Sequence, residues 1–287
     1  MCTYICRFVI LMRKISYTVP PALDGSSVAA VLRSHGFSTA LLRSLKKTYG
    51  ALSRNGCPVR TVDPVHTGDI VAVELNTDGA TAPPSAEKAV IVYADRDILV
   101  VNKRAGMAMY ETYNHHGNAL SNAVAAAGFD GPFRPIYRLD KDTSGLVVLA
   151  RHQLSAAKLA GKVQKDYYAV VPGAYTGSGT VDAPIAHCPD STVKRQVDPA
   201  GVRAVTHWEA LGQQGGRTLL RVQLETGRTH QIRVHFAHLG TPLVGDSLYG
   251  TAPVGARHLL HCKTRRLMHP VREEPVTFDC SFPSDME

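Results

Sequence analysis

Residues 134–150, RPIYRLDKDTSGLVVLA, constrain the fold of this chain more than any other segment. They place one carboxylate, Asp140, between the cation at Arg138 and a turn that begins at Thr143 and ends at Gly145. An apolar run of strand-forming residues follows directly. A carboxylate on such a turn can be held still and presented at the mouth of a pocket, where neighbouring cations keep it charged.

A second segment, residues 224–250, supplies possible partners for that carboxylate. Its sequence is LETGRTHQIRVHFAHLGTPLVGDSLYG, and it contains Arg228 and Arg233. The stretch THQIRVH alternates in polarity, which predicts a strand with Gln231, Arg233 and His235 on one face. Alternation alone leaves Arg233 as an ordinary surface residue of that strand, and an aspartate near a turn is usually a cap.

Charge and composition narrow the class of protein. Hydrophobic residues make up 44% and charged residues 20% of the 287, which is typical of a globular protein. Lys and Arg outnumber Asp and Glu by 32 to 24, which favours a polyanionic partner such as nucleic acid, although a basic surface can also be merely solvated. No apolar run approaches the roughly eighteen residues of a membrane span.

The cysteines indicate a reducing compartment. They show no recurring metal-ligand spacing, and a chain of this size does not need disulfides. At the N-terminus, Arg7 interrupts a short apolar run and no small-residue cleavage site follows, so we expect residues 1–13 to form an extension or an early strand rather than a signal peptide. We therefore predict a cytoplasmic protein. The six cysteines are Cys2, Cys6, Cys57, Cys188, Cys262 and Cys280.

The Pro-rich stretch 78–88 is the clearest linker, and it divides the chain into a module at 14–77 and a larger domain at 89–287. In the module, Ser26 or Ser27 and then Ser38 can cap two short helices, an Asn-Gly turn follows, and residues 70–75 form a strand. The larger domain mixes strands and helices without regular alternation. We expect an α+β fold with a mixed, largely antiparallel central sheet, preceded by a small α/β module.

Four separated motifs occur in an order that resembles one family, the pseudouridine synthases with the RLD signature. They are RLDKDTSG, KDYYAVV, GRTHQIRVH and HLLHC. The chain departs from the family at Tyr137, where His is usual. The module at 14–77 resembles an RNA-binding module named for a small-subunit ribosomal protein. The resemblance implies an isomerase that converts uridine in RNA to pseudouridine without a cofactor.

The resemblance also implies the site. Asp140 would be the catalytic aspartate, Arg233 its partner, Tyr167 the residue that stacks on uracil, and Leu260 an apolar wall. Tyr168 is expected in the core. Both routes open to Asp140, as nucleophile at the anomeric carbon or as base at the neighbouring carbon, need the ionised carboxylate. The remaining expected substrate contacts are Arg138, Thr143, Arg228, His230 and Gln231.

Other possibilities remain open from sequence alone. A non-catalytic RNA-binding or ribosome-assembly factor fits the same scaffold, and a glycosidase would need Asp142 or Glu225 as a second carboxylate. The histidines at 230, 235, 238, 258 and 261 lack the spacing of a zinc site, so we expect no metal. Ribosomal RNA of the large subunit is favoured over transfer RNA as substrate. A monomer is the default expectation.

Overall fold

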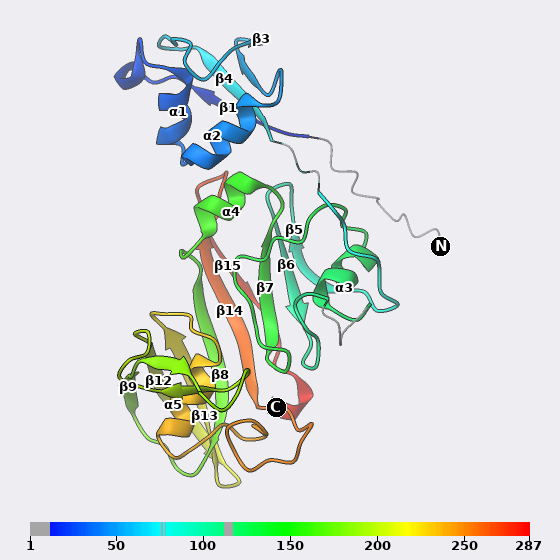
Figure 1. Cartoon of the computed structure of the whole chain (residues 1–287), viewed down its shortest axis with the longest axis vertical. Helices are drawn as coiled ribbons and strands as arrows, with labels where there is room; N and C mark the ends of the chain where they lie inside the picture. Colours follow the sequence, from blue (N-terminus) through cyan, green and yellow to red (C-terminus); the bar gives the residue numbers. More distant parts are fainter. Residues whose placement is uncertain (1–11, 76, 78, 112–116) are drawn as a thin grey trace.

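The structure is a computed structural model that describes residues 12–75, 77, 79–111 and 117–287. Most of the N-terminal extension, with Cys2 and Cys6, lies outside the described residues. None of the described helices is long and apolar enough to cross a membrane. Two sheets organise the chain, one on each side of the predicted linker (Figure 1).

The N-terminal module has a four-stranded antiparallel sheet in the order β1-β4-β2-β3, with two helices packed on it. Both predicted helices form, and their caps are Ser27 and Ser38, whose side chains accept hydrogen bonds from Ala30 N and Leu41 N. Asn55 and Gly56 both have positive φ, as a tight hairpin turn requires. The module's elements are β1 (Arg13–Thr18), η1 (Pro21–Leu23), α1 (Val28–Ser34), α2 (Thr39–Lys46), β2 (Leu52–Arg54), β3 (Cys57–Pro58) and β4 (Ile70–Leu75).

A nine-stranded sheet forms the larger domain. Its order is β5-β6-β7-β14-β8-β13-β12-β9, with β15 paired to β14, and β7 with β14 is its parallel pair. The expected mixed, largely antiparallel α+β fold is confirmed. Its strands are β5 (Val90–Ala94), β6 (Ile98–Lys103), β7 (Ser144–Ala150), β8 (Gln164–Pro172), β9 (Ser178–Asp182), β12 (Val205–Gln214), β13 (Arg217–Leu224), β14 (Leu260–Met268) and β15 (Pro275–Asp279).

The remaining elements lie around this sheet (Figure 1). A small hairpin, β10 with β11, contacts the helix α5. The predicted linker has no strand or helix in its described residues, and Pro83 O accepts a hydrogen bond from Asn122 on α3. These elements are α3 (Leu120–Ala126), α4 (Gln153–Leu159), β10 (Ile185–His187), β11 (Arg195–Val197), α5 (Gln231–His238) and η2 (Ser284–Met286).

Strand β7 lies at the centre of the domain and carries the predicted catalytic turn at its start. All seven of its residues are buried, and alternate side chains belong to hydrophobic clusters on opposite faces of the sheet. Gly145 has φ +115°, and a Cβ there would lie 2.2 Å from Cys262 O on β14. Only glycine permits this approach of β7 to β14, which fixes the turn against the sheet.

The prediction of a strand at THQIRVH was wrong, because Gln231–His238 form helix α5. Six of its eight residues are buried, polar and apolar alike. The alternation of polar and apolar residues therefore does not distinguish this helix from a strand. A short, nearly all-buried segment cannot be assigned from periodicity alone. Gln231 also fixes the helix start, since its side chain accepts a hydrogen bond from Arg228 N at 2.9 Å.

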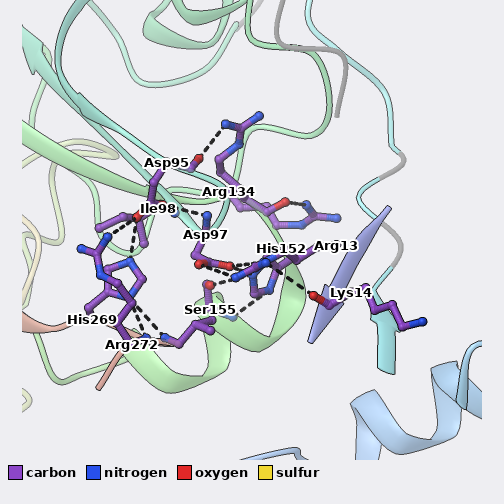
Figure 2. A network of polar contacts seen from close by, with 12 residues as sticks. Arg13, Lys14, Asp95, Asp97, Ile98, Arg134, His152, Ser155, His269 and Arg272 are labelled. Carbon is purple, nitrogen blue, oxygen red and sulfur yellow. Dashed lines mark hydrogen bonds and ion pairs between the residues drawn. The ribbon is translucent and has the colours of Figure 1, made fainter. Parts of the chain in front are cut away.

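The module is held to the larger domain by a polar cluster around Asp97, in the turn between β5 and β6 (Figure 2). Arg13 on β1 donates two hydrogen bonds to the Asp97 carboxylate, at 2.8 and 3.0 Å. His152 Nε2 lies 2.9 Å from the same carboxylate. Leu154 on α4 is part of the module's own hydrophobic core, so apolar packing accompanies the ion pair.

Candidate active site

A cavity of about 680 Å³ opens on the larger domain beside the start of β7. All nine residues that the sequence predicted for the site line it, although they come from four separate segments. These residues are Asp140, Tyr167, Arg233, Arg138, Leu260, Arg228, Thr143, His230 and Gln231. A cavity of this size is ample for one nucleotide.

Asp140 lies in this cavity with little protein coordination. Its side chain is 25% exposed, and its Oδ2 accepts a hydrogen bond from Arg233 Nη1 at 3.2 Å. The nearest ring nitrogen of His230 is 3.9 Å from the same oxygen. A charged carboxylate that faces a cavity and makes a single long contact keeps lone pairs free for a substrate.

Arg233 is fixed by a second carboxylate, Asp246, which sequence reasoning missed. Arg233 Nε and Nη2 donate to the two oxygens of Asp246 at 2.7 and 2.9 Å, a bidentate geometry. The Asp246 side chain is fully buried and also accepts from the backbone of Leu248 and Tyr249. Asp246 therefore orients Arg233 so that its third nitrogen faces Asp140. The Gly-Asp turn within LVGDSLYG was the available signal.

Lys103, which the sequence analysis did not identify, holds the turn that carries Asp140. Lys103 is fully buried at the end of β6, and its Nζ donates to the carbonyls of Arg104, Met107 and Lys141 at 2.8 to 3.0 Å. Burial lowers the pKa of Lys103 to about 7, against the opposing charges of Asp142 and Asp140. The lysine thus ties the residue after Asp140 to the sheet.

The segment before β14 braces the same turn from the side. His258 Nε2 lies 2.8 Å from Thr143 Oγ1, while Thr143 N donates to Asp140 O at 3.2 Å. Burial lowers the pKa of His258, so its ring is neutral in this contact. Arg257 Nη1 donates to Asp142 O at 2.8 Å. Thr143 is therefore bonded within the protein, and its side chain positions the turn.

Tyr167 and Leu260 form adjoining parts of the cavity wall, on β8 and β14. Tyr167 is 6% exposed, and burial raises the pKa of its hydroxyl to about 12. Leu260 is 4% exposed and pairs with Ala169 in the sheet. Tyr168 was expected in the core, but it points to the other face, half-buried against Phe282. The alternation of β8 thus places Tyr167, and not Tyr168, in the cavity wall.

Two residues at the entry to α5 are shaped by the fold. His230 has φ +58°, a left-handed conformation that is strained for a residue with a side chain, and its Nδ1 lies 2.8 Å from Tyr249 Oη. The Gln231 amide accepts from Thr226 and Arg228 and donates to Val205 and Thr206. Gln231 therefore holds this loop in place, and no hydrogen bond of its amide is left for a substrate.

Exposed cations surround the cavity mouth. Arg138, Lys141 and Arg228 are all exposed and line the cavity. Among the described residues, none of the three forms an ion pair within 4.0 Å with an acidic side chain. Arg228 does donate to the carbonyl of Arg203 at 3.1 Å. Uncompensated cations at a pocket rim attract a phosphate backbone.

A possible metal-ligand cluster lies elsewhere. Asp95, Asp97 and His269 bring one ligand atom each within 4.8 Å of one another, but none lines the cavity. Asp97 is bonded to Arg13 and His152, and Asp95 Oδ2 accepts from His269 at 2.8 Å. These carboxylates are already neutralised by cations and hydrogen-bond donors, so the cluster serves structure.

This sheet carries a partly exposed aspartate, an arginine and a tyrosine in one nucleotide-sized cavity, an arrangement suited to nucleoside chemistry. Residues 97–238 match the family model described as RNA pseudouridylate synthase. An uncharacterised RNA pseudouridine synthase of Bacillus subtilis, YjbO, is 36% identical over 264 residues, which cover 88% of this chain and 93% of that protein. Ribosomal large subunit pseudouridine synthase D of Xanthomonas campestris is 36% identical, covering 94% of this chain and 89% of its own length.

Solved structures agree. Human RNA pseudouridylate synthase domain containing 1 superposes with a TM-score of 0.58 and 27% identity, over 71% of this chain and 89% of that one. The chain therefore belongs to the RNA pseudouridylate synthase family. It is an isomerase that converts uridine in RNA to pseudouridine.

Proposed function

We propose that Asp140 is the catalytic group of this synthase and that its substrate is large-subunit ribosomal RNA. The observation that carries the first part is the contrast in coordination within the cavity. Asp246 takes both strong hydrogen bonds of Arg233, which leaves Asp140 with one hydrogen bond from Arg233 Nη1 and 25% exposed. Such a carboxylate can attack the anomeric carbon or remove the neighbouring proton.

The other contacts would hold a uridine that has left its stack. Tyr167 offers a ring for the base and Leu260 an apolar wall, while the rim cations Arg138 and Arg228 would bind flanking phosphates. His230 lies close enough to Asp140 to contact the same nucleotide. The proposal needs no redox cofactor, because turning and rejoining the base needs no change of oxidation state.

The relatives named ribosomal large subunit pseudouridine synthase D support the choice of RNA. The N-terminal module, proposed to span residues 14–77 and to be joined through 78–88 to a catalytic domain at 89–287, would add RNA affinity. Exposed cations on and beside α2 suit that role: Arg43, Lys46 and Lys47. We propose a monomer that works in the cytoplasm, where ribosomes are assembled.

Pseudouridine mapping of total RNA tests the proposal. Cells without the protein should lose pseudouridine at one or more positions of large-subunit ribosomal RNA, and the wild-type gene should restore them. The matched control is the Asp140→Asn gene, which should not restore them. Loss confined to transfer RNA would overturn the choice of substrate. Restoration by Asp140→Asn would overturn the role of Asp140.

A further inference from the structure

Two cations, Lys165 of β8 and Arg265 of β14, occupy directly paired positions of the central sheet. Both lie against the ring of Tyr137: Lys165 Nζ is 4.7 Å and the Arg265 guanidinium carbon 4.0 Å from its centre. Like charges directly opposite each other destabilise a strand pair. Cation–π contact with Tyr137 offsets part of that cost. We call the partly buried Lys165 and the fully buried Arg265 the buried cation pair.

The buried cation pair has no anionic partner among the described residues. Asp166, the neighbouring acid, is bonded to Arg266 at 2.8 Å and to Gln223 at 2.7 Å. Arg265 is fully buried, and its Nη1 has no hydrogen-bond acceptor within the described part of the protein. A buried cation without an anion costs free energy, so its persistence points to a use outside folding.

The buried cation pair adjoins the cavity. Lys165 is one of its lining residues, and its Nζ lies 3.9 Å from where a Cβ on Gly227, another lining residue, would stand. The Arg265 guanidinium carbon lies 5.2 Å from the ring centre of Tyr167. Lys165 therefore borders the space proposed for the uracil base. Arg265 contacts Tyr167, the residue that would contact that base.

We propose that the buried cation pair stabilises the negative charge that uracil acquires when its glycosidic bond breaks. Lys165 acts directly from the cavity wall, and Arg265 is a positioning residue that acts through Tyr137 and Tyr167. This inference rests on the proposed function and adds a role for two residues that it leaves unused. Preorganised charge in a water-poor site is an effective form of such stabilisation.

The chemistry requires such a charge on either route. As the bond from the anomeric carbon to N1 breaks, its electron pair moves to N1 and spreads to O2 and O4. Asp140 meanwhile bonds to the anomeric carbon or takes the neighbouring proton. Carbon 5 then bonds to the anomeric carbon and loses its proton, N1 gains one, and Asp140 is regenerated. Nothing is oxidised or reduced overall, and the uracil anion lies between the two halves.

The direct test is Lys165→Met, with Lys162→Met as the matched control because Lys162 is exposed in the same segment. Single-turnover cleavage of the bond between N1 and the anomeric carbon is measured with saturating enzyme on unmodified large-subunit ribosomal RNA, transcribed in vitro with uridine or with 5-fluorouridine, because carbon 5 of the fluorinated base has no proton to lose in the later step. Lys165→Met should slow uridine conversion roughly 100-fold and leave RNA affinity unchanged. The deficit should shrink with 5-fluorouridine, because fluorine stabilises the departing anion. Lys162→Met should match the wild type.

Opposite results overturn the inference in distinct ways. Weaker RNA binding by Lys165→Met with an unchanged rate at saturation would make Lys165 a phosphate ligand. An equal deficit on uridine and 5-fluorouridine would make it a structural residue. If the wild-type protein does not convert this RNA at all, the proposed function is contradicted. If both the wild type and Lys165→Met are fully active, the proposed function stands and only this inference is contradicted.

Arg265 is tested by stability and rate together. Arg265 Nη2 donates to Leu146 O at 3.2 Å, and Tyr137 Oη donates to the same carbonyl at 3.3 Å. Arg265→Met should unfold at a temperature no lower than wild type, because it removes a buried unpaired charge and leaves Leu146 O bonded to Tyr137. Its single-turnover rate should fall, and Arg265→Lys should restore much of it. A variant that is less stable but equally fast would show an ordinary structural arginine.

The pH profile gives an independent readout. Burial and the neighbouring Arg265 together lower the pKa of Lys165 to about 8, while Cys262 opposes. Burial raises the pKa of the facing groups Tyr137 and Cys262, so neither titrates near that value. The rate should therefore fall as pH rises through about 8, and Lys165→Met should lack that fall. A fall that survives in Lys165→Met would contradict the direct role of Lys165.

Discussion

Two aspartates of this protein, Asp140 and Asp97, each meet a guanidinium, but they differ in how completely they are coordinated. Asp97 is 5% exposed and receives two hydrogen bonds from Arg13 and one from His152 (Figure 2). Asp140 is 25% exposed and receives one, at 3.2 Å. Asp97, whose carboxylate receives three hydrogen bonds, is the saturated carboxylate and joins the N-terminal module to the larger domain. Asp140, whose carboxylate receives one, is the undersaturated carboxylate and faces the cavity.

The difference arises from the arginines. Arg13 has one carboxylate partner and gives it a bidentate contact. Arg233 has two, and Asp246 takes the bidentate contact because it is buried and further fixed by backbone donors. Asp246, the spare carboxylate that holds Arg233, thus leaves acceptor positions of Asp140 free, as the proposed chemistry requires. Ion pairs of similar composition can therefore have opposite purposes, and coordination distinguishes them.

After loss of the Asp140 carboxylate itself, the largest expected effect concerns Tyr167, the proposed partner of Asp140 in the cavity. Tyr167→Phe should lower the single-turnover rate roughly 10³-fold, since the hydroxyl that would exchange a proton at carbon 5 is lost while the ring remains. RNA affinity should not change. Tyr168→Phe is the matched control, because that ring packs on Phe282 at the other face. Equal rates for the two variants would exclude a chemical role for Tyr167.

Removing the spare carboxylate should make Asp140 resemble Asp97. In Asp246→Asn, Asp140 becomes the remaining carboxylate for Arg233, so the guanidinium should turn toward it. The rate should fall about 100-fold through this misplacement. The unfolding free energy should fall by about 3 kcal/mol, as for a broken buried pair. Single-turnover assays and thermal unfolding measure both, with Asp190→Asn as control, because Asp190 is exposed. Full activity would show that Asp246 does not orient the site.

Removing the saturated aspartate should affect stability and leave chemistry intact. Asp97→Asn should cost about 3 kcal/mol, because Arg13 and His152 lose their shared negative charge and one of its two acceptor oxygens. The rate at saturating RNA should equal that of wild type. Chemical denaturation and single-turnover assays provide the two values, and Arg96→Ala, exposed in the same turn, is the control. A large loss of rate with unchanged stability would reverse the roles assigned to the two aspartates.

The smallest effect is the pH dependence of that stability. Burial raises the pKa of Asp97, but hydrogen bonds and charge from His152 and Arg13 outweigh it and bring the pKa to about 2, from 3.8. A lowered pKa stabilises the fold above the unfolded value and loses this effect as pH falls through the folded one. The gap between wild type and Asp97→Asn should therefore shrink by about 2 kcal/mol from pH 4 to 2. Denaturation curves with a constant gap would contradict this.

Local signals predicted much of the fold. Ser27 and Ser38 mark the starts of α1 and α2 because a side-chain cap is a contact within a few residues. The resemblance to a family selected Tyr167 over its neighbour, and Tyr168, expected in the core, is half-buried on the other face of β8. Gln231–His238 misled reasoning from alternation, since burial on several sides erases the helical period. The resemblance to a family, more than periodicity, brought Asp140 and Arg233 together.

What the sequence did not predict depends on contacts between distant segments. Asp246, Lys103 and Arg257 act on the site through partners that only the folded sheet brings near. The sequence does not predict that Arg265 is buried, because charged residues are almost never fully buried unless they are paired. Supporting residues of this kind are found from coordination and burial.

The central claim is that the undersaturated carboxylate performs the chemistry. The direct measurement is pseudouridine formation by Asp140→Asn and Asp97→Asn on unmodified large-subunit ribosomal RNA, with binding measured in parallel. We expect Asp140→Asn to bind RNA like wild type and to be slower by roughly 10⁴-fold or more, while Asp97→Asn remains as fast as wild type. Comparable rates for Asp140→Asn and wild type would contradict the account.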